Sequence, residues 1–187
     1  MSKRLFDISI TCVMCVVCSL PIIFIFCVLR LTIGRPAFHW SKRVGRDNQI
    51  FLMPKFRTMR IDTPNVATHL LSSPEHWITP FGALLRKTSL DELPQLWSVL
   101  IGDMSLVGPR PALFNQDDLI NLRTEYGVHK ASPGITGWAQ INGRDDLSIE
   151  EKVKLDAEYL DSRSLGLDLW ILCLTAFKVL RRSEVSH

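Results

Sequence analysis

The run from Ile8 to Leu29 contains no charged residue, and it constrains the fold more than any other feature of the chain. As a helix it would be about 33 Å long, close to the roughly 30 Å hydrocarbon core of a bilayer. A cleaved signal peptide, a straight membrane span and a helix that enters and returns on one side are the three alternatives. The run is long for a signal peptide, and no A-x-A-like cleavage site follows it.

Basic residues flank this run on both sides. Lys3 and Arg4 precede it, and Arg30, Arg35, Lys42, Arg43 and Arg46 follow it. Lysine and arginine prefer the cytoplasmic side of a membrane, so a segment that keeps both ends on that side is favoured over a straight span. The simple span remains the alternative.

Ser19 and Pro21 supply a break within the run. Proline has no backbone N–H and its ring clashes with the preceding turn, so it kinks a helix. The hydroxyl of Ser19 is able to bond a carbonyl one turn back and to relieve part of the cost. We therefore expect a re-entrant membrane helix over residues 1–34, broken at these two positions.

Residues 35–187 are expected to form one domain at the cytoplasmic face. The 187-residue chain has a formal net charge of +3 and is 47% hydrophobic. Its basic residues are not interleaved with aromatic ones, so we expect no nucleic-acid partner. Five cysteines, an odd number, all lie in apolar segments, which argues against a disulfide framework. The five histidines show no metal-ligand spacing.

Two short strands are predicted at 38–44 and 50–56, joined by a turn over 45–48. Lys55 and Arg57 are two residues apart near the end of the second strand, so their side chains should face the same way. Two such cations are suited to a diphosphate. A basic edge facing water or lipid headgroups is an equal alternative.

Asp91 and Glu92 precede Pro94, which a helix accepts only in its first turn. A helix should therefore begin near Ser89 to Asp91, and Ser89 and Glu92 match a capping box. Acidic residues at a helix N-terminus are common as caps, so the pair alone is more typical of structure than of catalysis. Alternatively, one carboxylate attacks phosphorus while both help to hold a divalent cation.

Further along the chain, Arg110 lies between Pro109 and Pro111. This stiff segment positions a guanidinium that is suited to phosphate, although a rigid surface turn would look the same. Residues 133–137 read as a turn. Ser148 begins a capping box for a helix to about Leu160, and a second, amphipathic helix over 168–182 is expected to lie in the membrane interface.

Taken together, these segments resemble the bacterial sugar transferase family of small monotopic phosphoglycosyl transferases. The matching stretches cover nearly the whole chain in order: 3–7, 55–59, 89–95, 102–111, 133–140, 142–144, Asp156 and Tyr159. In one departure, Ser19 and Pro21 are separated by Leu20, whereas the family usually has serine and proline adjacent. The resemblance implies a mainly α-helical monotopic membrane protein with a small antiparallel β-hairpin and interface-lying amphipathic helices.

The resemblance also implies a reaction. Sugar 1-phosphate would pass from a UDP-sugar to polyprenol (undecaprenyl) phosphate with Mg²⁺, releasing UMP at the cytoplasmic face of the bacterial inner membrane. Asp91 would be the nucleophile of a phosphosugar–aspartyl intermediate, and Glu92 would share the metal. The phosphate- or nucleotide-binding candidates would be Lys55, Arg57, Arg86, Arg110 and Arg144, with Asp156 supporting one of the arginines.

Two other functions stay open on the sequence alone. A non-catalytic membrane adaptor would keep the fold and recruit a partner, and a membrane-associated hydrolase would use the acidic pair on a diphosphate. The sequence does not name the sugar. It also leaves open a homodimer, which interface-lying helices would be able to support.

Overall fold

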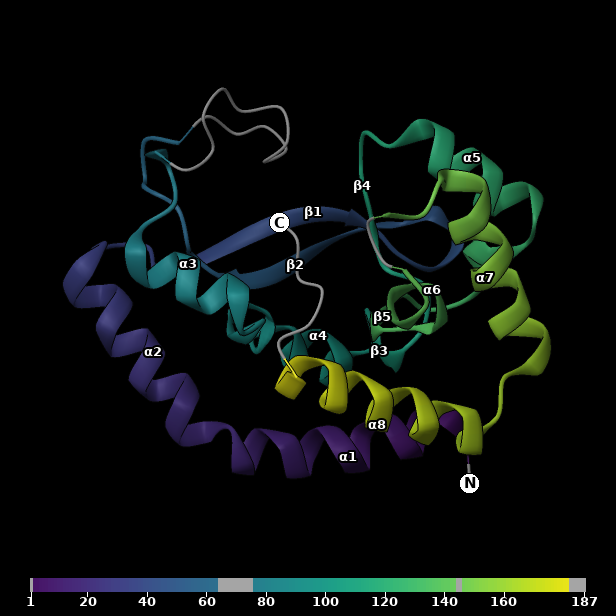
Figure 1. Cartoon of the computed structure of the whole chain (residues 1–187), viewed down its shortest axis with the longest axis horizontal. Coiled ribbons are helices and arrows are strands. Elements are labelled where there is room, and N and C mark those ends of the chain that lie inside the picture. Colours follow the sequence, from purple (N-terminus) through teal and green to yellow (C-terminus); the bar gives the residue numbers. More distant parts are fainter. Residues whose placement is uncertain (1, 64–75, 144–145, 182–187) are drawn as a thin grey trace.

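The computed structural model describes residues 2–63, 76–143 and 146–181. Its helices and 3-10 turns are α1 (Lys3–Val17), α2 (Ser19–Thr32), η1 (Arg46–Asn48), α3 (Pro80–Lys87), η4 (Leu90–Glu92), α4 (Gln95–Ile101), α5 (Asp117–Glu125), η5 (Val128–Lys130), α6 (Trp138–Ile141), α7 (Ile149–Ser162) and α8 (Leu165–Arg181). Its strands are β1 (Phe38–Val44), β2 (Ile50–Phe56), β3 (Ser105–Val107), β4 (Ala112–Leu113) and β5 (Gly134–Thr136). Figure 1 shows α1 and α8 along the lower edge of the molecule and α2 at one side, with the β1–β2 hairpin above them.

The N-terminal apolar run forms two helices bent by 59° at a break between Val17 and Ser19. Ser19 donates its hydroxyl proton to the Val16 carbonyl oxygen at 2.7 Å, as expected for a residue that eases the break. Pro21 lies in the first turn of α2, where its missing N–H costs least. Among the described residues no helix by itself has the length and apolar character of a membrane span, whereas α1 and α2 together have both.

Charged residues at the start of α1 hold this helix against the rest of the protein. The Lys3 Nζ lies 2.8 Å from Asp168 Oδ2 and 3.4 Å from Asp7 Oδ1. Asp7 is buried and accepts hydrogen bonds from the Ser105 hydroxyl at 2.8 Å and the Leu106 N–H at 3.3 Å. The helix is thereby joined both to α8 and to β3.

The predicted hairpin is confirmed with its bounds, as β1 and β2 pair antiparallel over 38–44 and 50–56. The sheet is larger than predicted, because β4 pairs with the free edge of β1 to give the order β2-β1-β4. The prediction of a turn over 133–137 was wrong. Residues Gly134–Thr136 form β5, which pairs parallel with β3 in a separate two-stranded sheet. Parallel pairing joins distant segments, so no local sequence signal marks it.

Two apolar clusters position the functional residues. In one, buried side chains of α4, β3, α7 and α8 pack together, and residues of α1 pack against them. In the other, Ile25 and Leu29 of α2 pack with Phe56 of β2 and Leu85 of α3. The short helix α4 therefore packs on α1, and Phe56 at the end of β2 packs on α2.

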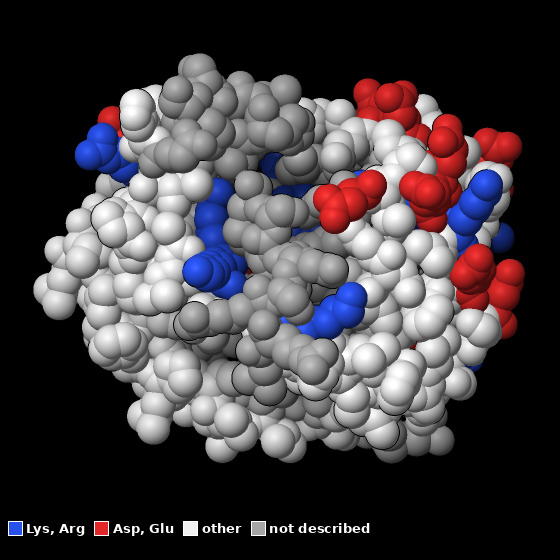
Figure 2. All heavy atoms as spheres, viewed as in Figure 1, with Lys and Arg blue, Asp and Glu red and all other residues white. Residues whose placement is uncertain are grey.

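The C-terminal helices largely match the predictions. Ser148 makes the predicted capping box at the start of α7. Helix α8 begins three residues earlier than predicted, and its apolar Leu169, Trp170 and Phe177 are exposed. Many apolar side chains of α1 and α2 are exposed as well. The lower edge in Figure 2, along these helices, shows no charged side chain among the described residues.

Candidate active site

The acidic pair lies in η4, the 3-10 turn that leads into α4. The helical region begins at Leu90, as Pro94 predicted, and α4 proper follows with Pro94 as its N-cap residue. The predicted capping box was wrong, because Ser89 adopts a left-handed conformation with φ 56° and its side chain makes no capping bond. This sharp turn between α3 and η4 sets the direction of the acidic pair.

Asp91 is buried, with 8% of its surface exposed. Burial raises the pKa of Asp91, and the neighbouring Glu92 raises it further, while Lys55 and Arg86 oppose the shift. Burial therefore disfavours the ionised carboxylate, which the two cations beside it stabilise.

Glu92 is held between cations from two separate segments. Lys55 Nζ, near the end of β2, lies 2.7 Å from Glu92 Oε1. Arg110 Nη2, in the loop after β3, lies 3.4 Å from the same oxygen. Burial lowers the pKa of Lys55, and Arg110 lowers it further, whereas Glu92 and Asp91 favour the charged form. The structure thus brings together four of the predicted residues: Asp91, Glu92, Lys55 and Arg110.

Arg86 reaches the same region from the last turn of α3. Its Nε donates a hydrogen bond to the Thr58 hydroxyl at 2.8 Å, which fixes the side chain. Burial lowers the pKa of Arg86 and Asp91 opposes that shift, so the two groups are electrostatic neighbours. Arg57 lies just beyond β2, and its Nε donates to the Pro36 carbonyl oxygen at 3.0 Å. Its contact is thus with the segment before β1.

Asp156 supports an arginine that the sequence reasoning did not single out. Its Oδ2 lies 2.6 Å from Arg123 Nη2 and 3.1 Å from Arg123 Nε. The same guanidinium donates from Nη1 to the Arg110 carbonyl oxygen at 2.7 Å. Asp156 was predicted to support one of the phosphate-binding arginines, and among the described residues it supports Arg110 indirectly, through Arg123. Arg123 lies on α5, 33 residues from its partner, and no local pattern links the two.

Arg43 was also missed, having been counted only among the basic residues that flank the apolar run. Its Nη1 donates to the Pro111 carbonyl oxygen at 3.2 Å. Burial and Arg110 lower the pKa of Arg43 to about 10, and Glu92 opposes the shift. The pairing of the two predicted strands could have indicated that Arg43 lies near Lys55. His39 pairs with Lys55, and alternate residues of β1 share that face of the sheet, which includes Arg43.

The resulting site is a carboxylate pair surrounded by cations. Figure 2 shows basic side chains gathered in the middle of one face, while acidic ones collect over α5 and α7. The remaining predicted cation, Arg144, lies outside the described residues. An excess of positive charge around two carboxylates is suited to a ligand that brings several negative charges.

The two carboxylates are also suited to binding a metal ion. No group of three or more histidine, cysteine, aspartate or glutamate side chains within the described residues is arranged to hold one. Mg²⁺, however, is commonly bound by one or two carboxylates together with substrate phosphates. Asp91 and Glu92 provide such a pair of hard oxygen donors, and the residues present fit this mode.

Comparison with known proteins identifies the family. The family described as "Bacterial sugar transferase" matches residues 1–182. The chain belongs to the bacterial sugar transferase family. It is 48% identical over 180 residues to the "Uncharacterized sugar transferase EpsL" of Bacillus subtilis, covering 95% of this chain and 87% of that protein.

Two further relatives of this sugar transferase carry more specific names. An "Undecaprenyl-phosphate galactose phosphotransferase" of Salmonella typhimurium is 37% identical over 195 residues, which is 96% of this chain and 41% of that protein. A "UDP-glucose:undecaprenyl-phosphate glucose-1-phosphate transferase" of Escherichia coli is 37% identical over 183 residues, 94% of this chain and 39% of that protein. The chain thus spans about two fifths of the length of these two relatives.

Proposed function

We propose that this sugar transferase moves a sugar 1-phosphate from a UDP-sugar to polyprenol phosphate and releases UMP. Two relatives are named for transfer to undecaprenyl phosphate, and one of them for a UDP-sugar donor. The observation that carries the proposal is the position of Asp91. It is a buried carboxylate beside Lys55 and Arg86, and its neighbour Glu92 is bound by Lys55 and Arg110.

The proposed chemistry has two steps at one phosphorus. A carboxylate oxygen of Asp91 attacks the sugar-bearing phosphorus, the bond from that phosphorus to the bridging oxygen breaks, and UMP leaves. A phosphate oxygen of the polyprenol phosphate then attacks the same phosphorus and releases Asp91. The two substrates are both anionic, so the cations around Asp91 would hold them in turn and offset the charge that repels an anionic nucleophile.

Mg²⁺ belongs to the proposal as the cofactor. Asp91, Glu92 and the diphosphate of the donor would bind this ion, and the ion would neutralise part of the phosphate charge. Glu92 already binds two cationic side chains through one oxygen, Oε1. Within this proposal Lys55 and Arg110 keep Glu92 oriented, and Asp156 keeps the backbone of Arg110 in place through Arg123.

The proposed location is the cytoplasmic face of the bacterial inner membrane. The bent pair of α1 and α2 has the length and composition to enter a bilayer, and we propose that it re-enters on the same side. Exposed apolar side chains of α8 would lie in the interface beside it. Residues 35–187 would then hold the acidic pair close to a lipid-soluble acceptor.

A transfer assay tests the proposal. Purified full-length protein would be incubated with Mg²⁺, polyprenol phosphate and a panel of UDP-sugars, with UMP release and label in the lipid phase as readouts. We expect transfer with at least one UDP-sugar, and loss of it in Asp91→Asn but not in Asp161→Asn, a charge-matched exposed position on α7. Free sugar phosphate without acceptor would indicate a hydrolase instead, and no turnover with any UDP-sugar would indicate an adaptor.

A further inference from the structure

A cavity lies away from the acidic pair, at the opposite end of α4. Its volume is about 850 Å³, and it opens between the start of α1, the start of α8, β3 and η5. Gly102, the residue that ends α4, lines it, whereas Asp91 precedes the N-terminus of that helix. Gly102 follows Asp91 by eleven positions, a separation of about 16 Å at helical rise. Among the described residues, the cavity shares none with the candidate active site.

Cations outnumber carboxylates in this cavity. Within the described ranges, the charged residues of its lining are Lys3, Arg4, Arg46, Lys130 and Arg163 against Asp7 and Asp168. The two carboxylates are already engaged, because both bind Lys3, and Asp168 also lies 2.6 Å from the Tyr159 hydroxyl. Arg4 is engaged too, donating to the carbonyl oxygens of Val99 and Leu100 at the end of α4.

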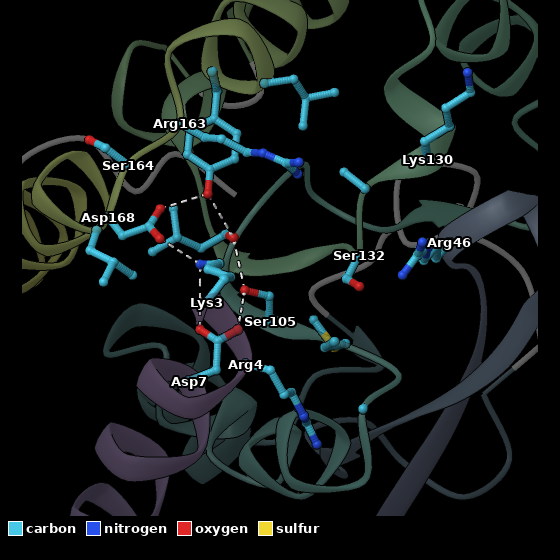
Figure 3. A pocket seen from close by; sticks show the side chains of 17 residues that line it. Lys3, Arg4, Asp7, Arg46, Ser105, Lys130, Ser132, Arg163, Ser164 and Asp168 are labelled. Atoms are coloured by element: carbon cyan, nitrogen blue, oxygen red, sulfur yellow. Dashed lines mark hydrogen bonds and ion pairs between the residues drawn. The ribbon is translucent and has the colours of Figure 1, made fainter. Parts of the chain in front are cut away.

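The remaining cations stand around the open side of the cavity. Within the described part of the chain, Arg163 and Lys130 make no hydrogen bond or ion pair through their side chains, and Arg46 contacts only its exposed neighbour Asp47, at 3.4 Å. Figure 3 shows Arg163 and Lys130 on opposite sides of the space, with Ser132 and Arg46 along the same wall as Lys130. The cavity thus presents guanidinium, ammonium and hydroxyl donors, the set that a phosphate group accepts from.

Exposed apolar residues of α1, α4 and α8 are neighbours in the chain of residues that line the cavity. Leu5 follows the lining residue Arg4, Leu169 follows the lining residue Asp168, and Ile101 precedes the lining residue Gly102. The exposed fractions of these three apolar residues are 53%, 53% and 52%, respectively. These side chains continue the apolar surface of the N-terminal and C-terminal helices. A ligand that contacts both the cations of the cavity and these apolar side chains has a phosphate at one end and hydrocarbon at the other.

We propose that this cavity binds the phosphate headgroup of an anionic phospholipid, whose acyl chains lie over Leu5, Ile101 and Leu169. The cation excess favours a headgroup with net negative charge over a zwitterionic one. A lipid held there would join the start of α1, the start of α8 and the end of α4. It would hold the C-terminal end of α4, the end far from Asp91, in a fixed position relative to the bilayer. The inference concerns lipid binding and does not depend on the proposed transfer reaction.

Lipid titration of the full-length protein in neutral detergent tests this inference. Dioleoylphosphatidylglycerol and dioleoylphosphatidylcholine would be added separately, with bound lipid counted by native mass spectrometry. We expect the first lipid to bind and the second to bind at least about tenfold more weakly. The double substitution Lys130→Gln with Arg163→Gln should weaken phosphatidylglycerol binding by about tenfold or more. The control Lys42→Gln with Lys154→Gln removes the same charge from exposed positions outside the cavity and should leave binding unchanged.

Two results would overturn the proposal. One is phosphatidylglycerol binding that is unchanged when the cavity cations are removed, or equally weakened by the control. The other is displacement of the lipid by inorganic phosphate or glycerol 3-phosphate at equal concentration, which would indicate a site for soluble phosphates. Circular dichroism would confirm folding, and if the double variant does not fold, Arg46→Gln decides in its place. Weaker binding in that variant supports the site, and unchanged binding refutes it.

Discussion

The Lys55 ammonium lies 2.7 Å from Oε1 of Glu92, and Arg110 approaches the same carboxylate oxygen to 3.4 Å. This contact joins the end of β2 to the turn before α4 and to the proline-flanked segment after β3. It leaves Asp91, the neighbouring carboxylate, directed into a buried environment shared with Lys55 and Arg86. Two adjacent acids thus have different surroundings, which is the basis for giving them different roles.

Lys55 and Glu92 are predicted to be coupled in catalysis. A hydrogen bond to a charged group contributes about 1.5–3 kcal/mol, so Lys55→Gln should lower kcat/KM by about 10- to 150-fold. Glu92→Gln should have an effect of similar size. The double variant should lose less than the product of the two single effects, because the second change removes a partner already lost. Multiplicative effects in this cycle would show that the contact is not used in the reaction.

Asp91→Asn is predicted to be inactive and yet at least as stable as the native protein at neutral pH. Burial raises the pKa of Asp91 in the folded state, so the ionised side chain disfavours folding at any pH above that folded-state pKa. As the pH falls through it, the native protein should gain stability relative to the variant. Thermal denaturation of both proteins over a pH series checks this, and a variant that is less stable at neutral pH would contradict it.

The same shift predicts the acid limb of the pH–rate profile. In the proposed mechanism only ionised Asp91 attacks phosphorus, and kcat/KM reports the pKa values of the free enzyme. The rate should therefore fall with decreasing pH around a midpoint above the ordinary aspartate value of about 3.9. Lys55→Gln removes a cation that lowers the pKa of Asp91, so it should move this midpoint to higher pH. A midpoint that stays in place in that variant would argue against the proximity of the two groups.

Arg123 and Asp156 are predicted to act as positioning residues. Breaking a buried ion pair by removing one partner costs about 3–5 kcal/mol of folding free energy, so Asp156→Asn should be strongly destabilised in thermal denaturation. Asp161→Asn, on the same helix but exposed, should be close to native. At a temperature where both variants are folded, Asp156→Asn should also lower kcat/KM, because the Arg110 backbone loses its support. Arg123→Gln should show both losses in full, whereas Arg123→Lys, which keeps the positive charge, should show smaller ones.

The elements that local sequence signals control were predictable. The hairpin over 38–44 and 50–56, the capping box at Ser148 and the break at Ser19 all depend on residues a few positions apart. The position of the acidic pair ahead of α4 followed from Pro94 alone.

The features that were missed depend on distant segments or on burial. The pairing of β3 with β5 joins residues about thirty positions apart in the sequence, and the ion pair of Asp156 with Arg123 has a similar sequence separation. The raised pKa of Asp91 arises because the surrounding elements bury it, and the local sequence does not show that burial. Arg43 was overlooked because its basic neighbours suggested membrane flanking instead of a strand face.

Residues 2 and 34 are predicted to lie on the same side of the membrane. The 59° bend between α1 and α2 turns the chain but does not fold it into a tight hairpin, so re-entry needs a direct test. Single cysteines at Ser2 and Gly34, in a background without the five native cysteines, should both react with a membrane-impermeant reagent from the cytoplasmic side. Labelling from opposite sides would establish a straight span.

Trapping the covalent intermediate tests the central proposal most directly. Native protein would be mixed with Mg²⁺ and a UDP-sugar labelled in the sugar, without polyprenol phosphate, and quenched under denaturing conditions. We predict that label becomes attached to the protein in step with an equal amount of UMP, that peptide mapping places it on Asp91, and that adding polyprenol phosphate before the quench removes it. Protein that turns over with the lipid acceptor but never carries label, or label that persists in Asp91→Asn, would contradict the assignment of Asp91 as the nucleophile.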